Sequence, residues 1–227
     1  MANNCYTYAI IENCNKEKLS TLIDSVENIN KKLHEKKLIS AKEDPMRAVA
    51  LAIGLTDSFL DGYYTFSDGE VIKTEVKPEV SLRGYFLDHE FCETNQAFIF
   101  SIESAWTPLT DFMDLVEEYL EGNLSYIAEE PGNGIFEKHG TYYPENFLVD
   151  MCIEDEYVRE GCETLRDIVE YICSEIKDDS VYLPYRKILE STEIKELADL
   201  DPIIMKMDEI LSDIGDGYIS VNEYEKV

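Results

Sequence analysis

The stretch Phe98–Phe136 constrains the fold more than any other part of the chain. It predicts a strand, the residues Trp106-Thr107-Pro108, an amphipathic helix over 108–121, a second strand over 124–129 and a Pro-Gly-Asn-Gly turn. Apolar residues recur at helical spacing within this helix, and Gly122-Asn123 ends it. A helix with one apolar face between two strands has to pack that face against a sheet. We therefore expect an α+β domain.

The preceding part of the chain supplies the other elements of a recurring plan. A β-branched and aromatic run predicts a strand over 5–12, and a helix capped by Asn15 follows over 16–36. Two more strands are predicted over 82–91 and 96–104. The resulting order, βαββαβ, is that of a ferredoxin-like antiparallel sheet with its helices on one face.

Two segments lie outside this plan. The first, 44–76, is an insertion after the first helix, with a helix opened by Asp44-Pro45 and a hairpin that turns at Asp68-Gly69. The second is the C-terminal part of the chain, where successive apolar stripes predict helices. We expect a ferredoxin-like domain over 1–157 and a helical extension over 158–227 that packs on or beside it.

Short motifs within the predicted sheet resemble those of a known family. They are the opening MANNCYTYAIIENC, the strand end SAW followed by Thr107-Pro108, and the strand–turn YIAEEPGNGIF. All three are similar to the YubB ferredoxin-like family, and the resemblance covers roughly residues 1–155. It implies a ferredoxin-like fold and a gene carried by plasmids, phages or genomic islands. It implies no reaction, because the family has no established catalytic residues. The insertion and the helical tail depart from the family pattern.

Charge restricts the partners of this chain. Its formal net charge is −28, from 48 acidic and 20 basic residues. Self-repulsion at such a charge costs stability. Nucleic acids and anionic membranes need a basic footprint, so direct binding of either is not expected. A basic protein surface is the natural partner, and an acidic surface that serves only solubility is the alternative.

The predicted helix over 108–121 carries a stripe of carboxylates at helical spacing. Its members are Asp111, Asp114, Glu118 and Glu121, with Glu117 beside them. Such neighbours sit about 5–6 Å apart, similar to the spacing of phosphates along a nucleic-acid strand. Together with Glu129 and Glu130, they form an acidic face in our interpretation. This face would engage a host nucleic-acid-handling or defence protein as an inhibitor or decoy, although a solvated helix face has the same pattern.

The residues Trp106-Thr107-Pro108 join a strand to this helix. A structural role predicts that Trp106 packs at the strand end, that Thr107 caps the helix and that Pro108 is its first residue. A contact between Trp106 and a ligand is the alternative.

Catalytic patterns are weak in this chain. Glu129 and Glu130 are adjacent on a predicted strand, so they point to opposite faces and cannot form a glycosidase-type pair. A hydrolase or transferase that uses one of them with His89 or His139 is the enzymatic alternative. A module whose helical tail forms a homo-oligomer is the structural alternative, and the sequence leaves the oligomeric state open.

A degenerate calcium loop near the C-terminus is a weak candidate metal site, with Asp213, Asp216 and Glu223 as candidate ligands. Two loop positions that need carboxylates lack them. A turn at Gly217 into a terminal strand is therefore the simpler interpretation, and we expect no metal and no cofactor.

The sequence also predicts the compartment. The N-terminus has no signal-peptide pattern, no apolar run reaches membrane-spanning length, and the six cysteines include no CxxC pair. We expect a cytoplasmic protein with reduced thiols.

Overall fold

The computed structural model describes most of the chain. The described residues are 4–35, 45–55, 82–153, 156–176, 183–214 and 217–227. They divide into two compact units, one of Met1–Tyr143 with Lys226–Val227 and the other of Pro144–Glu225. Each unit combines a β-sheet with helices, so the chain has the expected α+β class, although the C-terminal extension was expected to be helical.

The first unit is built on a six-stranded sheet in the order β2-β3-β1-β4-β5-β9. Its strands are β1 (Asn4–Glu12), β2 (Gly84–Cys92), β3 (Ala97–Ala105), β4 (Asn123–Glu130), β5 (Ile135–His139) and β9 (Glu225–Lys226). Strand β1 pairs antiparallel with β3 on one side and β4 on the other. The β2–β3 and β4–β5 pairs are also antiparallel. The four strands predicted between residues 5 and 129 are thus confirmed, within two residues at each end.

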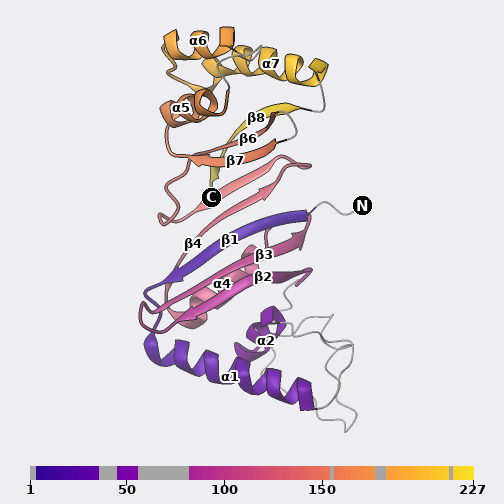
Figure 1. The fold of residues 1–227 in the computed structure, drawn as a ribbon. Coiled ribbons are helices and arrows are strands. Elements are labelled where there is room, and N and C mark those ends of the chain that lie inside the picture. Colours follow the sequence, from indigo (N-terminus) through magenta and orange to yellow (C-terminus); the bar gives the residue numbers. More distant parts are fainter. Residues whose placement is uncertain (1–3, 36–44, 56–81, 154–155, 177–182, 215–216) are drawn as a thin grey trace. The chain divides into compact units, whose positions relative to one another are not determined.

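Three described helices pack on one face of this sheet, as Figure 1 shows. They are α1 (Lys16–Glu35), α2 (Pro45–Ala52) and α4 (Thr110–Leu120). The predicted cap of α1 is confirmed, because Asn15 Oδ1 accepts the backbone N–H groups of Glu17 and Lys18 at 3.1 and 3.3 Å. Helix α2 begins at the expected proline and ends at Ala52. The hairpin expected around Asp68-Gly69 lies outside the described residues.

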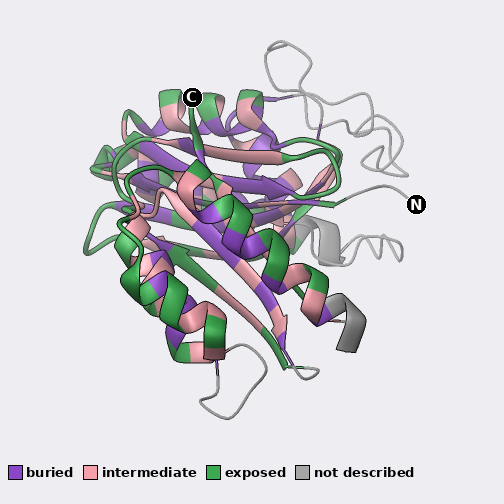
Figure 2. Cartoon of the chain, turned by 90° about the horizontal axis from the view of Figure 1, so that it is seen from above, coloured by how far each residue is buried: buried purple, intermediate pink, exposed green. Residues whose placement is uncertain are grey.

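Aromatic side chains fill the space between the sheet and helix α4. The rings of Phe98 and Phe100 lie 4.7 Å apart, and Phe86 lies 5.4 Å from Phe100 and 6.2 Å from Phe112. Each fully buried phenylalanine stabilises the fold by about 1.5–3 kcal/mol. Figure 2 shows that the longer helices carry both buried and exposed residues, whereas α2 has no exposed residue.

The second unit has a smaller sheet of three strands in the order β7-β6-β8. Its strands are β6 (Phe147–Ile153), β7 (Glu156–Cys162) and β8 (Tyr218–Glu223), and its helices are α5 (Leu165–Glu175), α6 (Leu183–Ser191) and α7 (Leu197–Ile214). Residues from all three helices share an apolar core with β6 and β8. No helix in the described part of either unit is both long and apolar enough to cross a membrane.

The units divide after Tyr143, whereas the sequence predicted a domain boundary after residue 157. The difference arises because β6 pairs with β7 and also with β8, which is close to the C-terminus. The local pattern of residues 147–153 does not reveal which other strands complete the sheet of β6. The helical region therefore begins at Leu165 and packs on a sheet of its own.

The last helix begins earlier than its sequence signal. Asp201-Pro202 is a typical helix start, yet α7 begins at Leu197 and contains Pro202 in its interior. The Asp199 carboxylate accepts the backbone N–H groups of Lys195 and Glu196, at 2.8 and 3.1 Å. These bonds organise the turn before the proline, so the helix does not need the proline as its first residue.

Candidate functional site

Helix α4 presents part of the expected acidic face to solvent. Asp111, Asp114 and Glu118 are exposed, while Phe112 and Val116 on the opposite side of the helix are buried. None of the three carboxylates forms an ion pair with a residue that the structure describes. We call these three residues the acidic stripe. Their negative charge is available to a partner along the outer side of the helix.

The charge at Asp114 is held at a cost. Its pKa is raised above the usual value, first because partial burial disfavours the ionised form and then because Glu117 and Asp111 repel it. His139 acts in the opposite direction. Folding thus opposes ionisation of this carboxylate.

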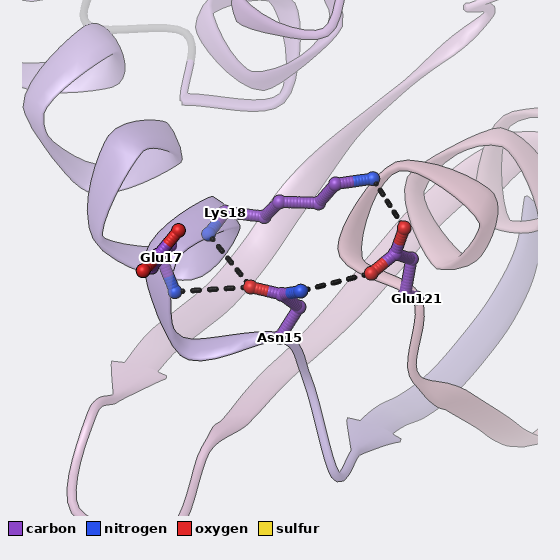
Figure 3. A network of polar contacts seen from close by, with 4 residues as sticks. All are labelled: Asn15, Glu17, Lys18 and Glu121. Carbon is purple, nitrogen blue, oxygen red and sulfur yellow. Dashed lines mark hydrogen bonds and ion pairs between the residues drawn. The ribbon is translucent and has the colours of Figure 1, made fainter.

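Two other predicted members of the face are engaged within the molecule. Glu117 Oε1 accepts the backbone N–H of Leu124 at 2.8 Å, which ties helix α4 to β4. Glu121 receives Lys18 Nζ and Asn15 Nδ2, both at 2.9 Å, as Figure 3 shows. These contacts lower the pKa of Glu121, with the hydrogen bond from Lys18 as the largest cause. Both carboxylates serve the fold.

The expected exposure of Glu129 and Glu130 is wrong. Their exposed fractions are 3% and 1%. The Glu130 carboxylate accepts the backbone N–H of Asn133 in the turn that follows β4. A buried carboxylate that closes a turn in this way stabilises the local chain path. These two residues are removed from the acidic face.

Trp106 is more exposed and more strained than a simple joint requires. Its side chain is 44% exposed, and its φ of +78° lies in the left-handed region that bulky residues rarely adopt. The predicted cap at Thr107 and helix start at Pro108 are wrong, because α4 begins at Thr110 after Leu109. The carbonyl of Thr107 instead accepts the Ser104 hydroxyl at 2.7 Å. This bond turns the chain directly after β3 and thereby holds Trp106 outwards.

Two neighbouring cavities open near the end of β3. The larger, of about 560 Å³, is bordered by Arg47, Arg83 and Glu103, and the smaller, of about 390 Å³, by Trp106 and Asp111. Arg83 and Ala105 border both cavities. We call this region the arginine cleft. It lies where β2 begins and β3 ends, so residues from β1, α2, β2, β3 and the start of α4 meet there.

The sequence did not single out this cleft. Arg47 and Arg83 are far apart in the chain, and neither belongs to a motif. Their meeting depends on how α2 packs beside the start of β2. Basic residues are rare in this chain, so each of them is a candidate for binding an anion. The sequence does not show which of these basic residues lie on the same surface.

The structure disperses the residues of the enzymatic alternative. His89 is on β2, which two strands separate from β4, and its ring stacks on Phe86 at 5.5 Å. Burial lowers the pKa of His89. His139 pairs across the sheet with Tyr126, whereas Glu130 pairs with Ile135 further along the same ladder. His139 and Glu130 are therefore not cross-strand neighbours in the β4–β5 pair.

Two of the candidate calcium ligands lie on regular elements. Asp213 is in the last turn of α7, Glu223 is the last residue of β8, and Asp216 lies outside the described residues. Strand β8 pairs with β6 along its whole length. This pairing holds the segment extended, whereas an EF-hand loop wraps around its ion. Across the described ranges, no group of three or more His, Cys, Asp and Glu side chains is placed to hold a metal ion.

Comparisons with protein-family models, curated proteins and solved structures find no match to this chain. The geometry of the acidic stripe and of the arginine cleft therefore carries the functional argument.

Proposed function

We propose that the protein is a non-enzymatic binding protein whose acidic stripe engages a basic surface of another protein. One observation carries this proposal: the carboxylates of Asp111, Asp114 and Glu118 are exposed together along α4, and none of them forms an ion pair with a residue that the structure describes. Partial burial and then the neighbouring acids raise the pKa of Asp114, so the fold does not compensate this charge. Asp111 and Glu118 extend the same charge along the helix.

The fold gives the stripe a rigid support. Helix α4 buries Phe112, Met113, Val116 and Leu120 against the sheet. The contacts of Glu117 and Glu121 fix its C-terminal half. A prearranged charged surface speeds association with an oppositely charged partner, and salt screens the attraction. We infer that the partner binds quickly at low ionic strength and less well as salt rises.

The same proposal includes an origin and a partner class. The antiparallel order β2-β3-β1-β4 and the motifs around Trp106 and Glu130 support a ferredoxin-like domain related to the YubB family. Such a relationship implies a mobile genetic element, whose target is a basic nucleic-acid-handling or defence protein of the host. The spacing of the carboxylates, similar to that of phosphates, supports a decoy or inhibitor.

The proposed compartment is the cytoplasm. All six cysteines lie in the described residues and none forms a disulfide. Burial raises the pKa of Cys5, Cys14 and Cys162 to about 11, so these thiols stay protonated and poorly reactive at neutral pH. Unreactive, unpaired thiols are typical of a reducing compartment.

The test compares two charge reversals of equal size in the full chain. One variant carries Asp111→Lys, Asp114→Lys and Glu118→Lys. The matched control carries Glu156→Lys, Glu160→Lys and Glu209→Lys, which are exposed carboxylates of the second unit. Wild type and both variants are immobilised, and proteins retained from a host lysate are identified by mass spectrometry at low and high salt.

A basic protein retained by wild type and by the control, but lost with the α4 reversal, supports the proposal. The affinity of that protein should fall at least about tenfold between 50 mM and 500 mM salt, because the Debye length shortens across this range. Equal retention by both variants, or retention independent of salt, contradicts a specific acidic stripe. Equal loss from both variants indicates that only total charge matters.

A further inference from the structure

The arginine cleft differs in charge from the rest of this acidic chain. Two arginines and one glutamate border its larger cavity, whereas the chain as a whole has more than twice as many acids as bases. Glu103, the glutamate concerned, accepts Asn4 Nδ2 at 2.8 Å. A hydrogen bond to Glu103 is also the main reason that the pKa of Tyr85 is raised. Glu103 is therefore engaged within the protein, and two guanidinium groups lie at the same cavity.

Two exposed aromatic rings accompany these arginines. Tyr85 borders the larger cavity and is 47% exposed, while Trp106 borders the smaller one. Exposed aromatic rings beside arginines are the usual means of holding a planar, negatively charged ligand, because rings stack and guanidinium groups bind phosphate oxygens. The volumes of the two cavities lie in the range of small-molecule sites.

We propose that the arginine cleft binds a small nucleotide, with its phosphate between Arg47 and Arg83 and its base against Trp106. Asp111 borders the cavity on the base side, where a carboxylate accepts hydrogen bonds from amino or ribose hydroxyl groups. Gly84 lets β2 pair closely with β3 at the edge of the cavity, because a side-chain carbon there would come within 2.6 Å of the Glu103 carbonyl oxygen. The site shares Asp111 with the acidic stripe, but its ligand differs from the protein partner proposed for the stripe.

The chain supplies its own probe for this proposal. Trp106 is its only tryptophan, so tryptophan emission reports on the cleft alone. The full protein is titrated with AMP, ATP, GMP and GTP, and with adenosine and inorganic phosphate as partial ligands. Calorimetry of the same pairs provides a second measurement that does not depend on fluorescence.

We expect saturable quenching by at least one nucleotide, with at least tenfold weaker binding of adenosine and of phosphate. Arg83→Gln and Arg47→Gln should each weaken that nucleotide at least about tenfold, the usual size of a lost charge-assisted hydrogen bond. Arg166→Gln is the matched control, since Arg166 is exposed in the second unit and pairs with Glu170. The Arg166→Gln variant should bind the nucleotide with the affinity of the wild type. Circular dichroism establishes that each variant is folded.

Three results would overturn the proposal. Absence of quenching and of heat with all four nucleotides at about 5 mM excludes the ligand class. If adenosine binds as tightly as AMP, the arginines do not bind the phosphate. If inorganic phosphate binds as tightly as AMP, Trp106 does not bind the base. Reversal of Asp114 and Glu118 should leave nucleotide affinity unchanged, so failure of the acidic stripe and failure of the cleft can be told apart.

Discussion

Helix α4 ends in a closed network against helix α1, whereas it begins beside two cavities and an exposed tryptophan. At its C-terminal end, the Leu120 carbonyl accepts the Asn15 N–H at 2.8 Å, and Glu121 binds Lys18 and Asn15 side chains (Figure 3). At its N-terminal end, Leu109 provides no side-chain cap, and Trp106 holds a strained φ. One helix therefore has an end that is internally satisfied and an end that is open.

This difference separates residues that serve the fold from residues available for binding. The closed end uses carboxylates that the sequence assigned to a binding face. The open end combines an exposed tryptophan, a strained backbone and two cavities. These features lower the stability of the fold, which is typical of a binding site. Substitutions at the closed end should therefore change stability, and substitutions at the open end should change binding more than stability.

The largest effect is expected from Gly122→Ala at the closed end. A β-carbon there would contact Ile11 Cγ2 and come within 2.9 Å of the Glu12 carbonyl oxygen. We expect the free energy of unfolding to fall by about 1–3 kcal/mol, as in other overpacked sites. Thr110→Ala at the open end is the counterpart and should change it by less than about 0.5 kcal/mol. Urea unfolding followed by circular dichroism measures both, and equal losses would contradict the comparison.

An intermediate effect is expected at Trp106. Because its φ is positive, Trp106→Gly should be more stable than Trp106→Ala by about 1 kcal/mol, although both remove the ring. Ala105→Gly in the adjacent strand is the control and should show the usual order, with glycine less stable than alanine. Thermal unfolding of the three variants distinguishes the cases. An alanine variant as stable as the glycine variant would mean that the backbone at 106 relaxes without cost.

The smallest effect is expected when two carboxylates at α4 are neutralised one at a time, since the two substitutions should change stability in opposite directions. Asp114→Asn should slightly raise stability at pH 7, by less than about 0.5 kcal/mol, because it removes a charge that partial burial and then the like charges of Glu117 and Asp111 disfavour. Glu121→Gln should lower it, because a carboxylate held by Lys18 is lost. Melting temperatures at pH 7 decide the signs, and two changes of the same sign would contradict the assignment.

The pH dependence of both effects follows from the pKa shifts. The pKa of Glu121 is lowered in the folded protein, so its stabilisation is present above the unfolded value of 4.5 and is lost as pH falls through the folded value. The pKa of Asp114 is raised, so its penalty is present at neutral pH and disappears as pH falls through that raised value towards 3.8. Both differences from wild type should therefore vanish in acid.

Local patterns predicted individual elements well and the division into units poorly. Asn15 caps its helix as expected, and the strand predicted over 5–12 is present as β1. These features depend on short-range periodicity and on the hydrogen bonds of neighbouring residues. The boundary at Tyr143 depends on the pairing of β6 with a strand near the C-terminus. Such a pairing joins residues remote in the chain and leaves no local pattern.

The sequence by itself determined that the chain is an acidic α+β protein with a carboxylate stripe on one helix. Net charge and helical spacing are properties of the chain, so no contact is needed to read them. Only the tertiary structure decided that Glu129 and Glu130 are buried, that Glu121 faces Lys18 and that Arg47 meets Arg83. Burial and charge pairing depend on which surfaces pack together, because the same side chain is solvated on one side of an element and enclosed on the other.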